Sequence, residues 1–148
     1  MLFGKKTAPQ FDDSRIRWKT LDGIDHLAYH IYRVDQEREI VDAIFKFDAS
    51  KKIFLHKHHA EYVTLVMDGE LRIYKPNGEL KEVRPTGSYV LTQPGADAHT
   101  EGGGDMDTIV FFSIRGTKGA FYDILDEALA PIETVGFEDF KALYQAQH

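Results

Sequence analysis

Short runs of strand-forming residues, separated by turn signals, recur through most of this 148-residue chain. Within them apolar and polar residues tend to alternate, and a period of two places successive side chains on opposite faces of a strand. Many short strands at such regular spacing are typical of a β-sandwich or barrel. We therefore predict an all-β fold. The runs are 14–20, 27–34, 40–47, 52–58, 62–67, 70–74, 80–83, 88–93, 107–114 and 121–125.

Glycine-containing turn signals separate several of these runs. Asp68-Gly69 predicts a tight hairpin turn between the runs on either side of it. Residues 75–78 predict a second turn, and the glycine-rich segment 101–105 is expected to be a flexible loop.

The hydrophobic period changes only near the C-terminus. Phe137, Phe140, Leu143 and Tyr144 recur at helical spacing. They predict one amphipathic helix over 137–147, whose aromatic stripe packs on the core.

Length and composition favour a single domain. The hydrophobic fraction of 43% and the aromatic fraction of 12% suffice for one packed interior. We expect one domain over 1–148, with a barrel core at about 38–116. An N-terminal arm and strands would occupy 1–37, and a strand and helix 117–148.

Charge and hydropathy argue against two classes of partner. A net charge of -6 and the lack of any long basic run disfavour nucleic-acid binding. No apolar run approaches the roughly 20 residues of a membrane span, and the N-terminus lacks the apolar region of a signal peptide. We expect a cytoplasmic protein that binds neither nucleic acid nor membrane.

The chain has no cysteine. Disulfides, thiolate catalysis and cysteine-ligated metal sites are therefore excluded. Any metal ion must be held by His, Glu, Asp or Tyr.

Three histidines form the strongest candidate site. His56 and His58 are two residues apart in a predicted strand and so point to the same face. His99 follows the turn signal Pro94-Gly95. Three neutral imidazoles are a suitable ligand set for a divalent transition metal. Single strand histidines such as His59 and His30 are ordinarily surface or hydrogen-bonded residues and are not assigned to the metal.

These motifs resemble those of the cupins, which are double-stranded β-helix (jelly-roll) barrels. The cupin pattern is H-x-H followed by an acidic ligand and a glycine, and then G, P and H. The resemblance covers about residues 40–115 and implies a cupin barrel with the predicted C-terminal helix outside it. It does not settle the reaction, because cupins include dioxygenases, isomerases, decarboxylases, sensors and storage proteins. The matching residues are 56–62 with Gly69, and Gly87, Pro94 and His99.

One position departs from the cupin pattern. Tyr62 stands where the acidic ligand is usual, and Glu61 is expected on the opposite strand face. The chain is therefore similar to the three-histidine cupins that cleave acetylacetone or dihydroxyacetophenone with non-haem iron(II). Iron(II) is the metal this resemblance implies, with zinc, nickel and manganese as alternatives. A bulge between His58 and Tyr62 would instead make Glu61 a fourth ligand.

The resemblance implies an iron(II) dioxygenase that cleaves a carbon-carbon bond in a β-diketone or hydroxyketone. Three neutral ligands leave the ion its full charge, which favours an anionic bidentate substrate together with O2. Tyr62 is a candidate hydrogen-bond donor to a substrate carbonyl, or alternatively a phenolate ligand of the metal, and Gln93 is a candidate partner of a bound water or substrate oxygen. Both also fit a purely structural role as paired polar residues of the barrel interior.

Two other functions are open at this point. One is a non-catalytic cupin that binds metal and a small ligand as a sensor. The other is a metal-dependent isomerase or hydrolase, which needs a general base such as Glu61 or Glu101. In each case we expect a homodimer or homotetramer, because the strands of 16–34 offer a free sheet edge.

Overall fold

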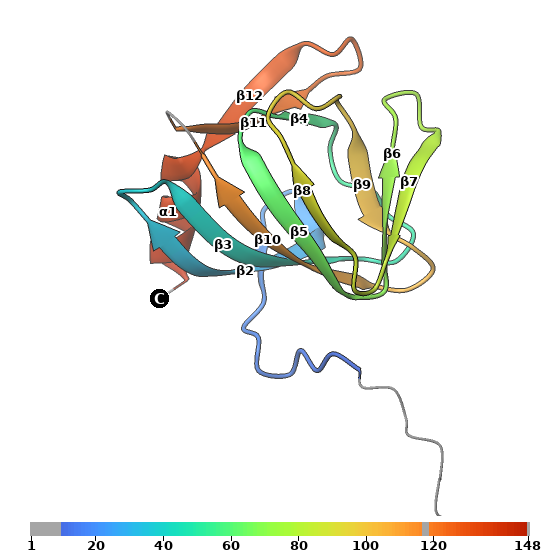
Figure 1. The fold of residues 1–148 in the computed structure, drawn as a ribbon, viewed down its shortest axis with the longest axis horizontal. Helices are drawn as coiled ribbons and strands as arrows, with labels where there is room; N and C mark the ends of the chain where they lie inside the picture. Colours follow the sequence, from blue (N-terminus) through green and yellow to red (C-terminus); the bar gives the residue numbers. More distant parts are fainter. Residues whose placement is uncertain (1–9, 117–118, 148) are drawn as a thin grey trace, which may run out of the picture.

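The computed structural model describes residues 10–116 and 119–147 of the chain. Among these residues there are β-strands in two layers and one C-terminal helix, so the predicted all-β class is confirmed (Figure 1). The elements are β1 (Lys19–Leu21), β2 (Ile24–Asp35), β3 (Ile40–Phe47), β4 (His56–His58), β5 (Glu61–Asp68), β6 (Glu70–Tyr74), β7 (Leu80–Pro85), β8 (Tyr89–Thr92), β9 (Thr100–Gly103), β10 (Thr108–Arg115), β11 (Ala120–Leu125), β12 (Pro131–Gly136) and α1 (Phe137–Ala146).

The first layer is a six-stranded antiparallel sheet in the order β1-β2-β3-β10-β5-β8. β10 lies inside it, and most of its side chains are buried, as its continuous apolar run predicts. Phe112 of β10 stands opposite Ala43 on one side and Thr64 on the other. The side chain of Phe112 is buried.

The second layer consists of two three-stranded sheets, β12-β11-β4 and β7-β6-β9. An isolated β-bridge between His56 and His99 joins them. The two residues exchange both backbone hydrogen bonds, each at 3.0 Å. The bridge closes the second layer across the barrel at the position of two of the predicted metal ligands.

The predicted hairpin at Asp68-Gly69 is wrong. β5 pairs with β8 and β10, whereas β6 pairs with β7 and β9. The chain therefore crosses from one layer to the other at this turn. Gly69 has a φ of 75°, and a Cβ there would lie 2.6 Å from Oγ1 of Thr108. Glycine is required here because residues 107 and 108 pass too close for a side chain.

The predicted flexible loop at 101–105 is also wrong in its first half. Residues 100–103 form β9, which pairs with β6, and Glu101, Gly102 and Gly103 are buried. A Cβ on Gly102 would lie 1.8 Å from the carbonyl oxygen of Lys51. Glycine is present here because another backbone passes too close for a side chain.

The N-terminal strand is shorter than predicted. Of 14–20, only the last two residues belong to β1, while Asp13 accepts hydrogen bonds from Trp18 Nε1 (3.0 Å) and Lys46 Nζ (2.9 Å). The predicted run 52–58 likewise contracts to β4, and β12 was not predicted. The part of the predicted arm at residues 1–9 lies outside the described residues.

The C-terminal helix is confirmed and packs against β2, β3 and β12 beside the barrel (Figure 1). Phe137 and Phe140 are buried, and the ring of Phe121 lies near both, at 6.3 and 5.5 Å between centroids. The Gln147 side chain donates to Ile31 O (2.6 Å) and accepts from Ile31 N (3.2 Å), where β2 is bulged. These contacts fix the helix against the barrel as predicted.

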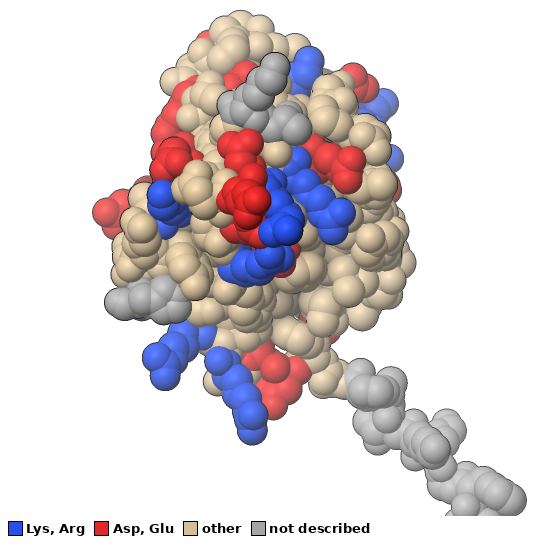
Figure 2. Space-filling view, turned by 60° about the vertical axis from the view of Figure 1, so that its left-hand side comes forward, with Lys and Arg blue, Asp and Glu red and all other residues tan. Residues whose placement is uncertain are grey.

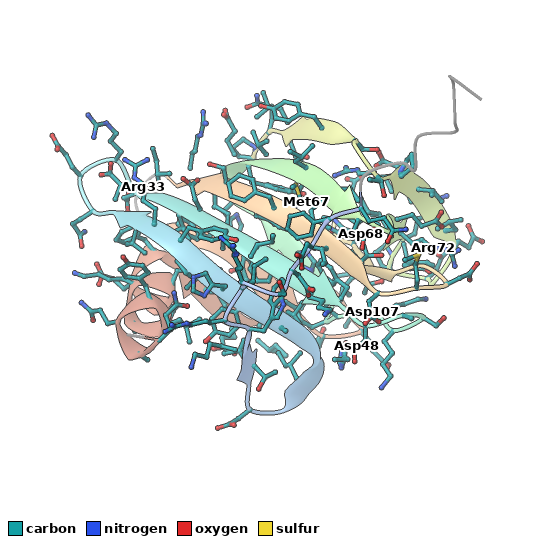
Figure 3. All side chains as sticks on the ribbon, turned by 90° about the horizontal axis from the view of Figure 1, so that it is seen from below. Arg33, Asp48, Met67, Asp68, Arg72 and Asp107 are labelled. Carbon is teal, nitrogen blue, oxygen red and sulfur yellow. The ribbon has the colours of Figure 1, made fainter. Side chains whose placement is uncertain are left out.

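The visible surface carries both signs of charge. On the face shown in Figure 2, Lys and Arg side chains lie beside Asp and Glu rather than in a continuous basic patch. Among the described residues, no helix is long and apolar enough to cross a membrane. Asp48, Asp68, Arg72 and Asp107 lie at the end of the barrel away from α1 (Figure 3).

Gly102→Ala should destabilise the fold by at least about 2 kcal/mol, because the new methyl group meets the Lys51 carbonyl. Gly23→Ala is the control: its surroundings are open, and only its positive φ of 82° is strained, at a cost of about 1 kcal/mol. Urea unfolding of both variants measures the difference. Equal losses would contradict the close approach at Gly102.

Candidate metal centre

β4 presents His56 and His58 to the barrel interior. Both side chains are buried and Lys57 between them is exposed, as the alternation of a strand requires. β11 pairs with β4 and places Tyr122 opposite His58. The predicted convergence of the two imidazoles is present in the structure.

His99 reaches the same point from the turn before β9. Gly95 adopts a φ of 85°, and its N–H donates to the His58 carbonyl oxygen at 3.2 Å, which ties the turn to β4. The bridge to His56 then sets the position of the His99 backbone. The Pro-Gly turn signal thus places the third histidine as predicted.

One ring nitrogen from each of the three histidines lies within 4.8 Å of the other two. The Nδ1 atoms of His56 and His99 lie 3.0 Å from the carbonyl oxygens of Phe54 and Asp97. A carbonyl oxygen only accepts, so Nδ1 carries the proton and the Nε2 lone pair is free for a ligand bond. Both nitrogens of His58 and Nε2 of His99 are buried without a hydrogen-bond partner among the described residues.

Burial favours the neutral form of His56 and His58. It lowers the pKa of His56, although the nearby Glu101 carboxylate acts in the opposite direction. Burial, together with the neighbouring imidazoles, holds the pKa of His58 well below its usual value. Buried imidazoles whose Nε2 atoms are available as ligands fit a divalent transition metal, and His56, His58 and His99 would hold it.

A carboxylate lies beside the three histidines, contrary to the expectation that none offsets the charge of the ion. Glu101 of β9 is buried, and its Oε1 lies 3.6 Å from Nε2 of His56. It is two residues after His99 and so faces the interior with it. The same alternation was readable in the sequence, but the adjoining glycines predicted a loop.

Tyr62 is buried on β5 and its ring stacks on His58 at 3.9 Å between centroids. Its hydroxyl is hydrogen-bonded to the Thr92 side chain, and burial raises the pKa of the phenol. Glu61 is only half-buried and stands opposite Arg115, so the structure does not place it among the histidines. Gln93 is exposed after β8 and is not among the described residues that line the cavity.

His56 and His58 line a partly open cavity of about 50 Å³. Apart from His56, His58 and Glu101, its lining is apolar or aromatic. Tyr122 of β11 and Phe140 of α1 belong to this lining, and no sequence signal marked them because distant elements bring them to the site. The other lining residues are Leu27, Phe45, Phe47, Ile53, Phe54, Phe112 and Ile114.

The remaining histidines of the predicted strands have other partners. His59 points outward, with Nε2 2.7 Å from Oδ2 of Asp123. Nδ1 of His30 lies 3.1 Å from the Arg17 carbonyl oxygen. Neither belongs to the metal-ligand group.

No protein-family model matches the sequence, and a comparison with curated proteins finds none that matches it. The structure is nevertheless similar to solved ones. An RmlC-like cupin protein from Ralstonia eutropha JMP134 has a TM-score of 0.74 and 18% identity, over 99% of this chain and 90% of that chain. An acetylacetone dioxygenase from Acinetobacter johnsonii has a TM-score of 0.72 and 16% identity, over 98% of this chain and 97% of that chain.

A more distant similarity is to a DMSP lyase from Ruegeria pomeroyi, with a TM-score of 0.56 and 15% identity, over 73% of this chain and 60% of that chain. At these identities the similarities establish the fold. The chain has the cupin fold, and its three histidines form a candidate metal site.

The purified chain should contain about one transition-metal ion, and His99→Ala should lose it because two imidazoles do not hold the ion tightly. Elemental analysis measures this. His59→Ala is the matched control, because His59 belongs to the same sequence motif but pairs with Asp123. Equal loss of metal in both variants would contradict the assignment.

Proposed function

We propose that this protein is a non-haem iron(II) dioxygenase that cleaves a carbon-carbon bond in a β-diketone or hydroxyketone. The observation that carries the proposal is the buried group of His56, His58 and His99. His58 and His99 have unpartnered ring nitrogens, and His56 and His58 line a largely apolar cavity. The similarity to an acetylacetone dioxygenase supports the same reaction class. Both atoms of O2 would enter the two carbonyl or carboxylate fragments, so no external reductant is consumed.

His56, His58 and His99 would hold the ion, which would supply Lewis acidity, a template for the substrate and a route for electrons to O2. The carbonyl groups of Phe54 and Asp97 keep the rings of His56 and His99 oriented through Nδ1. The stacked ring of Tyr62 restricts rotation of His58. The chain thereby orients the three ligands before substrate binds.

Glu101 is the group placed to accept a proton from the substrate. A β-diketone binds best as its enolate, so a proton must leave the carbon between the two carbonyls. Glu101 Oε1 faces the ligand atom of His56 and lines the cavity. A carboxylate at this position can take up that proton directly.

Aromatic side chains make the surroundings of this chemistry largely apolar. Phe45, Phe54 and Phe112 line the cavity, and an apolar wall strengthens electrostatic interactions within it. Burial raises the pKa of Tyr122, whose phenol therefore stays protonated as a hydrogen-bond donor. Tyr62 and Gln93 remain proposals for substrate contacts: neither belongs to the described cavity lining, and Tyr62 is the nearer to the site because its ring stacks on His58.

Oxygen uptake tests the proposed function. The chain reconstituted with iron(II) should consume one O2 for each acetylacetone or aryl hydroxyketone cleaved, while His99→Ala should consume none above the buffer rate. The zinc-loaded chain is the control, because zinc has no redox chemistry. Substrate loss without oxygen uptake would overturn the dioxygenase proposal.

Glu101 also favours a second candidate function. A buried carboxylate beside a metal site is the arrangement that a metal-dependent isomerase or lyase uses to move a proton without O2. The structural similarity to a DMSP lyase is compatible with this class. The anaerobic reaction of the zinc-loaded chain separates it from the dioxygenase.

Glu101→Gln should lower turnover by about a hundredfold or more while the metal content is kept, because the amide cannot accept the proton. Steady-state kinetics and the exchange of deuterium into the central carbon of a diketone measure the loss. Glu61→Gln is the control, since Glu61 lies opposite Arg115 and outside the cavity lining. Unchanged exchange in Glu101→Gln would remove the proton-acceptor role.

A further inference from the structure

A second hollow, of about 530 Å³, lies beside the metal cavity. It is bounded by the β1–β2 turn, by β11 and β12, and by α1. Its volume is in the range of ordinary small-molecule sites, whereas the metal cavity is about a tenth as large. The residues that line it are Leu21, Asp22, Ile24, Leu27, Tyr29, Phe45, Phe54, Tyr122, Ile124, Glu133, Val135, Asp139, Phe140, Ala142 and Leu143.

The two cavities are adjacent. Leu27, Phe45, Phe54, Tyr122 and Phe140 line both of them. Phe54 and Tyr122 stack at 6.1 Å between centroids, and each lies within 6 Å of the His56 ring, at 5.6 and 5.8 Å. Small rotations of these aromatic rings would connect the hollow to the metal ligands.

The charges around the hollow select against anions. Its ionisable lining groups, apart from tyrosines, are Asp22, Glu133 and Asp139, and no Lys or Arg belongs to the described lining. The rest of the lining is apolar. A carboxylate or phosphate would meet repulsion here without a cationic partner, whereas an uncharged aryl or alkyl group would be buried favourably.

We propose that this hollow holds an uncharged, apolar arm of the substrate, an aryl or branched alkyl group, whose carbonyl head lies at the metal centre. The inference rests on the proposed function and specifies its substrate class. The observations that carry it are the five shared lining residues, the volume and the one-signed charge of the lining. The hollow lies on the α1 side, and the acidic residues labelled in Figure 3 lie at the other end of the barrel.

Two ligands that share the diketone group and differ only in the apolar substituent test whether the hollow binds that substituent. The zinc-loaded chain should bind 1-phenyl-1,3-butanedione at least tenfold more tightly than acetylacetone by calorimetry. Ala142→Trp should fill the hollow and abolish this preference without weakening the binding of acetylacetone. Ala146→Trp is the control, because Ala146 is also an exposed position, one turn further along α1 and outside the lining.

A charged ligand and a charge-changing variant test the preference of the hollow for uncharged groups. The 4-carboxyphenyl analogue of the diketone should bind at least tenfold more weakly than the phenyl compound, and Glu133→Lys should restore most of that loss. Glu127→Lys makes the same charge change at an exposed residue outside the lining. Equal effects of the two lysine variants would mean that general surface charge is responsible, and would overturn the charge selection.

Acetophenone, which lacks the diketone head, keeps this test independent of the proposed function. Its binding to the chain by ligand-observed NMR should weaken in Ala142→Trp and not in Ala146→Trp. If the two tryptophan variants behave alike, or if acetophenone does not bind, the inference is wrong even when oxygen uptake is seen. If oxygen uptake fails while this contrast holds, the hollow remains an apolar ligand site and only the reaction is revised.

Discussion

The backbone bridge between His56 and His99 is the contact on which the rest of the site depends. It joins two three-stranded sheets that otherwise have separate partners, and it does so with both hydrogen bonds of an antiparallel pair. Because the two bridging residues are themselves proposed ligands, the backbone pairing that joins the two sheets also brings these ligands together. A strand framework of this kind holds side chains more precisely than a loop would.

The electrostatic environment of the interior determines what the bridged histidines can bind. Burial lowers the pKa of His56 and His58 and so favours their neutral forms, and the unpaired nitrogens of His58 and His99 lie within largely apolar surroundings. The buried Glu101 carboxylate beside them would be costly alone, and a bound cation would offset that cost. The ligand set and the carboxylate therefore support each other, and the aromatic residues that surround them separate this polar centre from the apolar hollow under α1.

The features readable from the sequence were those that depend on near neighbours. β3 and β10 appear within one residue of their predicted runs, because alternation and apolar content are properties of the segment itself. The turn at Asp68-Gly69 was located correctly, but its neighbours pair with other strands, since hydrogen-bond partners are chosen across the barrel. β9 was missed because glycine has two meanings, chain flexibility and close approach, and only the position of Lys51 distinguishes them.

The sequence by itself determined the all-β class, the C-terminal helix and the three candidate histidines. Each follows from residues close together in the chain: a period of two in the strands, helical spacing near the C-terminus, and the H-x-H and Pro-Gly signals. Tertiary structure alone decided that Glu101 stands beside His56 while Gln93 faces solvent, and that Tyr122 and Phe140 complete the cavity. These residues come from different strands and from the helix, and packing across the barrel brings them together. Local periodicity specifies the face on which a side chain lies, whereas the partner it meets there depends on how distant elements pack.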